Sequence, residues 1–158
     1  MANITLITVG TLKESYLKDA VAEYKKRLSQ YARVEEINIK EETIKNEDDR
    51  TEIARALDAE GEKILTAARD CYLIALCVEG KSPDSEELSA IIGRAIDISG
   101  RLAFVIGSSH GLSPAVKEKA AYRLSVSRLT FPHQLMRPLL YEAVYRSFTI
   151  LNGKRYHK

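Results

Sequence analysis

The stretch YLIALCV (residues 72–78) is an unbroken apolar run near the middle of a chain of 158 residues. Runs of this length are typical of β-strands that are covered on both faces of a parallel sheet. Four further strand-like segments lie along the chain: NITLITV (3–9), ARVEEINI (32–39), RLAFVIG (101–107) and YRLSVS (122–127). We therefore expect a five-stranded sheet that includes residues 72–78 as a buried strand.

Apolar residues at helical spacing separate these strands. They predict helices over residues 13–30, 51–68, about 82–100, 113–120 and 132–152. Ser82 or Ser85 is the candidate N-cap of the third helix, and Ser113 followed by Pro114 is typical of the start of the fourth. Strands that alternate with helices predict an α/β fold: a mostly parallel sheet with helices on both faces, in a single domain spanning residues 1–158.

The net charge is +2, but the charged residues are distributed unevenly along the chain. Residues 1–100 carry 14 Lys and Arg against 20 Asp and Glu, whereas residues 101–158 carry 10 against 2. A basic C-terminal part favours contact with a polyanion such as nucleic acid. The alternative is that the two parts interleave in the fold, so that their charges mix on the surface.

Composition narrows the class of protein further. No apolar run approaches the roughly 18 residues of a membrane span, and the N-terminal apolar segment lacks the basic start of a signal peptide. If the strand around residues 72–78 extends back to Cys71, Cys71 and Cys77 lie on it about 20 Å apart, too far for a disulfide. We expect free thiols in a cytoplasmic protein, no membrane contact and, without a ligand cluster, no metal site.

Three predicted strands end in loops that lead into helices: LCVEGK, IGSSHG and SRLTFPH. Ligands of parallel α/β sheets bind beyond the carboxyl ends of the strands, so these loops are expected to form one composite pocket. GSSHG (107–111) has three interpretations: a glycine loop whose amides approach a ligand, a tight structural turn, or a G-x-S-x-G nucleophile elbow with Ser109. The elbow needs an acid and a histidine further along the chain, and two pairs have the right order: Glu118 with His133, and Glu142 with His157.

The last predicted helix begins with polar residues inside LTFPHQLMR (129–137). At about 100° per residue, His133 and Arg137 lie on one stripe of that helix, with apolar residues on both of its flanks. Such a helix is expected to be covered on two sides, by its own sheet and by a second body, for which a partner subunit is one candidate. Pro138 is expected to remove one backbone hydrogen bond and to bend the helix near its start.

Five ordered segments resemble one known family over essentially the whole chain: ITLITVGTLKESYLKDAVAEYKKRL, LCVEGKSPDSEEL, FVIGSSHGL, LSVSRLTFPHQLMRPLLYEAVYRSF and the terminal YHK. These segments are similar to the ribosomal large-subunit pseudouridine N3-methyltransferases of bacteria (the RlmH family), which belong to the SPOUT methyltransferases. The resemblance implies a C-terminal trefoil knot, a homodimer, and methylation of a pseudouridine in 23S rRNA on the assembled ribosome. It also implies S-adenosylmethionine as co-substrate, held by Leu76, Gly107, Val126, Ser127, Arg128, Leu129, Thr130 and Phe131. Ser108 departs from the family, where a second glycine is expected, and Pro138 stands where an aliphatic residue is expected.

Transfer of a methyl group to an imide nitrogen requires positioning and removal of a proton, and the resemblance suggests residues for both. His133 is the candidate base or proton carrier, and Arg137 is the candidate group that stabilises a developing oxyanion or holds a phosphate. Tyr156 and His157 belong to a polar tail that is expected to reach a site, within the chain or across a dimer. Lys154, Arg155 and Lys158 are the candidate contacts of that tail to RNA phosphates. Two alternatives stay open: a Ser-His hydrolase that uses Ser109, and a non-catalytic RNA-binding module.

Overall fold

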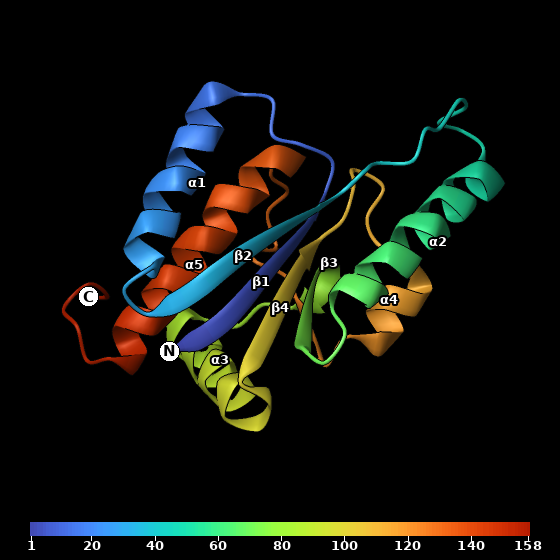
Figure 1. Ribbon diagram of the computed structural model, residues 1–158. Helices are drawn as coiled ribbons and strands as arrows, with labels where there is room; N and C mark the ends of the chain where they lie inside the picture. Colours follow the sequence, from blue (N-terminus) through green and yellow to red (C-terminus); the bar gives the residue numbers. More distant parts are fainter.

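The computed structural model describes all residues, 1–158, and shows five strands and five α-helices that alternate along the chain (Figure 1). The strands are β1 (Ala2–Val9), β2 (Ala32–Ile39), β3 (Tyr72–Lys81), β4 (Arg101–Ile106) and β5 (Tyr122–Leu124). The helices are α1 (Ser15–Leu28), α2 (Arg50–Ala67), α3 (Ser85–Ser99), α4 (Pro114–Lys119) and α5 (Met136–Leu151), and a 3₁₀ turn, η1 (His133–Leu135), precedes α5.

The five strands form one sheet in the order β2-β1-β4-β3-β5, and every neighbouring pair is parallel. The central strands are β1, β4 and β3, which have the most apolar sequences. The expected α/β fold with a parallel sheet is therefore confirmed. Because all strands run in the same direction, all of their carboxyl ends lie at one edge of the sheet.

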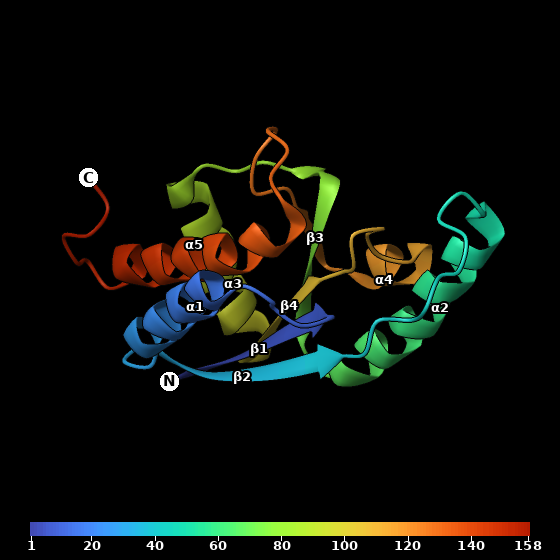
Figure 2. The ribbon, with the colours of Figure 1, turned by 90° about the horizontal axis from the view of Figure 1, so that it is seen from above.

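Helices cover both faces of the sheet, as the alternating pattern predicts (Figures 1 and 2). On one face α1, α3 and α5 pack over a core that includes Phe104 of β4 and Phe148 of α5. On the other face α2 and α4 pack over a second core that includes Val105 of β4 and Val116 of α4. Successive residues of β4 thus enter opposite cores, which explains why its sequence is apolar without alternation.

The helix starts agree with the sequence at α4 and differ at α3. Ser113 caps α4, since its hydroxyl accepts from the Val116 amide, and a proline follows it at the first helical position. The cap of α3 is Asp84, not Ser82 or Ser85: its carboxylate accepts from the Glu87 amide while the Glu87 side chain accepts from the Asp84 amide. A capping box needs Glu or Gln three residues after the cap, and only Asp84 has one, since Ser82 is followed at that spacing by Ser85 and Ser85 by Leu88.

Two boundaries near the C-terminus differ from the prediction. β5 ends at Leu124 and not at residue 127. The Ser125 amide donates to the carbonyl of Lys81, the last residue of β3, so residues 125–127 have no strand to pair with beyond that point. The α-helix begins at Met136, after the 3₁₀ turn. Pro138 is then the third helical residue, where an amide has no partner within the helix, so it removes no helical hydrogen bond there.

The two apolar flanks of α5 are covered by α1 and α3 of the same chain. Leu140, Val144 and Phe148 are buried in the core that these helices share. The flanks of α5 therefore give no evidence for a partner subunit.

Candidate functional site

A pocket of about 430 Å³ lies at the carboxyl edge of the sheet, where the chain leaves β3, β4 and β5. The three segments expected to meet do meet there, although LCVEGK is the last part of β3, which runs to Lys81, and not a loop after residue 78. All eight residues that the resemblance assigns to a co-substrate line this pocket: Leu76, Gly107, Val126, Ser127, Arg128, Leu129, Thr130 and Phe131. His133 lies in the same lining. The volume of the pocket is within the range of about 300–1,000 Å³ that is usual for small-molecule sites.

Gly107 sets the shape of one wall of this pocket. A Cβ atom on Gly107 would lie 2.2 Å from the carbonyl oxygen of Gly111, so no larger residue can occupy this position without a backbone shift. The loop is closed by a hydrogen bond of 2.9 Å from the Gly111 amide to the Ser108 carbonyl. Ser108, the residue that departs from the family, is buried, and its hydroxyl accepts from the His110 amide at 3.3 Å. Its side chain therefore supports the turn.

The opposite wall is the segment 125–131, which is fixed to the end of β3. The Ser125 amide donates to the Lys81 carbonyl at 2.8 Å, and the Ser125 hydroxyl donates to the Ser127 carbonyl at 2.9 Å. Gly80 allows this approach, since a Cβ there would lie 2.7 Å from the Arg123 carbonyl oxygen. The segment consequently presents its backbone to the pocket in a defined conformation.

A second hollow of about 590 Å³ adjoins the first, and we call it the polar cleft. Val9 is its only hydrophobic residue, and the others are Gly10, Thr11, Lys13, Asn38, Lys40, Glu41, Ser109, His133, Gln134 and Arg137. Ser109 and His133 line both hollows. His133 therefore lies at the boundary between the pocket and the cleft.

Burial lowers the pKa of His133 below its ordinary value, and the charge of Arg137 lowers it further, while Glu41 acts weakly in the opposite direction. The imidazole is thus neutral near neutral pH and free to accept a proton. Arg137 is buried, and its Nη2 donates to the carbonyls of Val9 at 3.3 Å and Gly10 at 2.6 Å. These bonds tie the start of α5 to the end of β1.

The structure offers no triad around Ser109. No hydrogen bond joins Ser109 to His133, and no carboxylate bonds to His133. Glu118 is exposed on α4. Glu142 accepts instead from Arg146 and from the Tyr156 hydroxyl, so neither candidate acid orients a histidine beside Ser109. The hydrolase alternative therefore has no geometric support.

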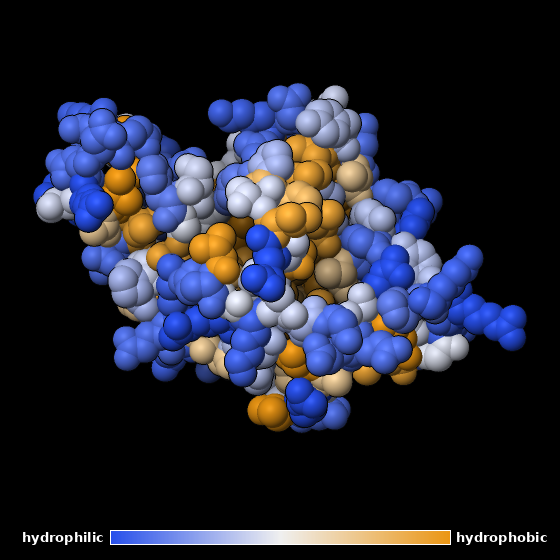
Figure 3. Space-filling view, turned by 180° about the vertical axis from the view of Figure 1, so that it is seen from behind, coloured by the Kyte–Doolittle hydropathy of each residue, from blue (hydrophilic) through white to orange (hydrophobic).

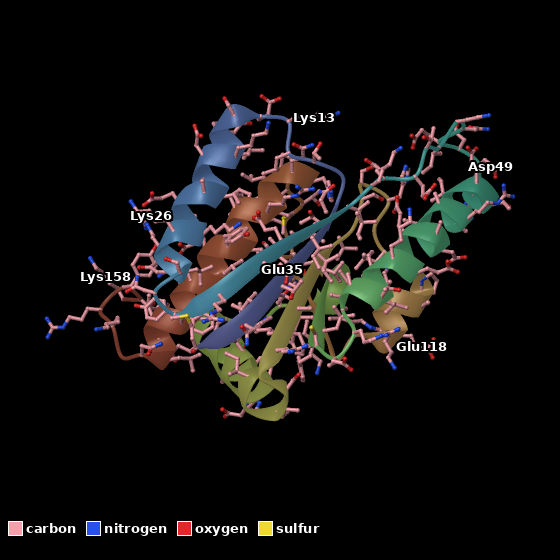
Figure 4. The ribbon with its side chains drawn as sticks, viewed as in Figure 1. Lys13, Lys26, Glu35, Asp49, Glu118 and Lys158 are labelled. Atoms are coloured by element: carbon pink, nitrogen blue, oxygen red, sulfur yellow. The ribbon has the colours of Figure 1, made fainter.

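Tyr156 and His157 lie at the other end of α5 from His133. The helix has 16 residues, about 24 Å of length. Tyr156 donates to Glu142 at 2.9 Å and packs against Tyr145, and His157 contacts Arg146 at 3.3 Å. Lys154, Arg155 and Lys158 are exposed nearby, and Figure 4 labels Lys158 beside the C-terminus. Within one chain the structure brings together His133, Arg137 and the pocket, but not the tail.

Sequence reasoning missed the residues of the cleft that come from the first forty positions, notably Lys13, Asn38 and Lys40. It also missed Gln134, whose side chain accepts from the Lys13 amide at 3.0 Å and donates to the Thr11 carbonyl at 3.3 Å. These pairs are more than 120 residues apart in the chain. No local pattern could have indicated them.

Three other features bear on the class of site. No group of three or more His, Cys, Asp or Glu side chains is placed to hold a metal ion. Cys71 and Cys77 are free thiols. None of the helices combines the length and the apolar character needed to cross a membrane.

Comparisons with known proteins agree with this geometry. The family model described as a predicted SPOUT methyltransferase matches residues 2–157. A Bacillus pumilus protein named ribosomal RNA large subunit methyltransferase H is 47% identical over 158 residues, covering 99% of each chain. Its Caldicellulosiruptor bescii namesake is 47% identical over 156 residues, covering 98% of this chain and 99% of the relative.

A solved structure from Bordetella pertussis, described as a probable methyltransferase, has the same fold. It superposes with a TM-score of 0.57 at 14% identity and covers 93% of this chain and 96% of that one. The match of nearly the full length to the family model, and the identity to the relatives, decide the classification. The chain belongs to the SPOUT methyltransferases and, among them, to the family of ribosomal RNA large subunit methyltransferase H.

Proposed function

We propose that this protein transfers a methyl group from S-adenosylmethionine to N3 of a pseudouridine in 23S rRNA, on the assembled ribosome in the cytoplasm. The observation that carries the proposal is the position of His133 between the pocket and the polar cleft. A methyl donor in the pocket and a nucleotide in the cleft would meet at this side chain.

The pocket is suited to S-adenosylmethionine by its chemistry. We propose that backbone amides and carbonyls of residues 107–111 and 125–131, which line the pocket, hold the adenine and the amino acid moiety. Leu76, Leu124 and Met136 provide apolar surface for the rest of the molecule. When bound, S-adenosylmethionine supplies an electrophilic methyl group on a sulfonium.

His133 is the proposed acceptor of the N3 proton, since burial keeps its imidazole neutral. Arg137 contributes positive charge to the cleft, and only its Nη2 is engaged with backbone carbonyls. We propose that its other N–H groups face a carbonyl oxygen or a phosphate of the nucleotide. Catalysis would then rest on positioning and proton removal.

We further propose a homodimer in which Tyr156 and His157, with Lys154, Arg155 and Lys158, complete the site of the partner. Two observations support it. The tail lies far from His133 within its own chain, and apolar side chains stay exposed beside the pocket, with Val78 96% and Leu129 73% accessible. Figure 3 shows apolar surface gathered at the centre of the back face.

The trefoil knot of the superfamily is part of the same proposal. It is supported by the course of the chain after β5, which is hydrogen-bonded to Lys81 at the end of β3. From there the chain returns so that α5 lies between α1 and α3.

Calorimetry with S-adenosylmethionine and mass spectrometry of 23S rRNA test the proposal together. We expect binding to the purified protein, and loss of one methylated pseudouridine from ribosomes of cells that lack it. Retention of that methyl group, or absence of binding, would refute the assignment, and RNA binding without methyl transfer would favour the non-catalytic module. Ser109→Ala is the control: it should keep methyl transfer, whereas a hydrolase that uses Ser109 would lose its activity.

A further inference from the structure

The chemistry of the polar cleft points to an anionic occupant. Lys13, Lys40 and Arg137 line it against a single carboxylate, Glu41. Neither Lys13 nor Lys40 takes part in any of the ion pairs of the structure, and both are exposed. Figure 4 shows Lys13 on the loop between β1 and α1. Two unpaired ammonium groups at the mouth of a polar hollow are suited to phosphate oxygens.

The loop that carries Lys13 is held in one conformation. The Gln134 side chain bonds to the backbone of Thr11 and Lys13, and Arg137 bonds to the carbonyl of Gly10. Asn38 donates to the Thr8 hydroxyl at 3.1 Å and also to the Gly10 carbonyl. Gly10 has a φ of +79°, which an L side chain rarely adopts. A binding surface ordered in advance loses less entropy when a ligand arrives.

The basic lining continues beyond the cleft. A neighbouring hollow of about 810 Å³ shares Thr11, Asn38 and Arg137 with it and adds Lys18 and Lys25. Lys25 is paired with Glu36 at 3.0 Å, but Lys18 has no acidic partner. Positive side chains thus follow one path from Lys40 past Lys13 to α1, which is suited to a chain of phosphates.

We propose that the polar cleft binds the RNA backbone on either side of the target nucleotide, with Lys13 and Lys40 contacting its phosphates. This inference rests on the proposed function, because it takes the nucleotide beside His133 to belong to RNA. Lys13 and Lys40 bind phosphate without reading the base, and Gln134 is a positioning residue that holds Lys13 in place.

The test is the double variant Lys13→Gln/Lys40→Gln, with ribosomes from cells lacking the protein as substrate. The matched control is Arg55→Gln/Lys119→Gln, which removes the same charge from exposed positions on α2 and α4. We expect the KM for ribosomes to rise about 10-fold in the test variant, with kcat and the affinity for S-adenosylmethionine unchanged. The slope of log KM against log salt should fall by about 1.4–1.8, at about 0.7–0.9 per lost phosphate contact.

The outcomes separate the inference from the function on which it rests. If the wild type methylates ribosomes and the test variant matches the control in KM and salt slope, the inference is wrong and the proposed function stands. If the wild type neither binds S-adenosylmethionine nor methylates ribosomes, the proposed function fails and the inference fails with it. Gln134→Leu should raise KM in the wild-type background but not in the Lys13→Gln background, since Gln134 acts through Lys13. An equal rise in both backgrounds would refute the positioning role.

Discussion

Replacing Gly107 by alanine should damage the pocket directly. The added Cβ would lie 2.2 Å from the Gly111 carbonyl oxygen and 2.8 Å from a methyl carbon of Leu112. Ordinary contact begins at 3.4 Å, so the loop backbone would have to move by about 1 Å. Overpacking of this kind costs about 1–3 kcal/mol. At about 2–4 °C per kcal/mol, a loss near the middle of that range lowers Tm by about 4–8 °C.

The affinity for S-adenosylmethionine should fall by about 10-fold or more, because each 1.4 kcal/mol lost from binding is a factor of ten. Calorimetry and thermal unfolding measure the two effects separately. Gly93→Ala is the control: inside α3 its Cβ would lie 3.1 Å from a terminal methyl carbon of Leu151, which can move aside, and alanine favours the helix by about 1 kcal/mol. If Gly107→Ala binds and unfolds like the wild type, the loop does not have the rigidity argued above.

Three more changes test groups near the site. Arg137→Lys should lower the free energy of unfolding in urea by about 1–3 kcal/mol, since one ammonium cannot replace the guanidinium that bonds Val9 and Gly10; unchanged stability would remove its anchoring role. In an NMR titration His133 should have a pKa below its ordinary value of 6.5, and a midpoint at or above 6.5 would contradict this prediction. Because the imidazole binds a proton more readily in the unfolded chain, the free energy of unfolding should fall as the pH drops from 6.5 to the lower pKa of the folded state. The His133→Gln variant should lack that part of the pH dependence. Glu60 is 2% exposed and one of its oxygens has no partner, and burial raises its pKa, so Glu60→Gln should stabilise the protein by about 1 kcal/mol near neutral pH. This gain in stability should disappear as the pH falls below the raised pKa of Glu60, because the native carboxyl is then protonated. An equal gain near neutral pH and below that pKa would argue against the prediction, as would a gain for the exposed control Glu62→Gln.

The secondary structure and the parallel sheet could be predicted from local sequence patterns, because a short apolar run such as residues 72–78 is typical of a strand buried on both faces. The end of β5 depends on a tertiary feature. β3 ends at Lys81, which accepts the Ser125 amide, so residues 125–127 have no strand to pair with, and nothing in the residues from 122 to 127 indicates this. The N-cap of α3 is Asp84 and not one of the two predicted serines, because Glu87 completes a capping box with Asp84. The sequence did contain this pattern.

The pocket was predictable and the polar cleft was not, for one physical reason. The pocket is built from strand ends that carry glycine and proline signals, so each of its loops can be recognised locally. The cleft depends on hydrogen bonds between residues 10–13 and residues 134–137, and a side-chain bond across 120 residues has no signature in a single sequence. The role of Arg137 as an anchor of β1 was missed for the same reason.

The order of the strands explains why these two hollows adjoin. The ends of β3, β4 and β5 form the pocket, and the ends of β1 and β2 contribute to the cleft, with β4 beside β1 in the sheet. In a parallel sheet these ends share one edge, so the proposed methyl donor in the pocket and the proposed acceptor in the cleft would be neighbours. The 3₁₀ turn that carries His133 lies over that boundary, and Gln134 and Arg137 bond it to the loop after β1. Those bonds couple the proposed base, His133, to the proposed acceptor side of the site. A change that loosens the loop after β1 should therefore impair methyl transfer even when the affinity for S-adenosylmethionine is intact.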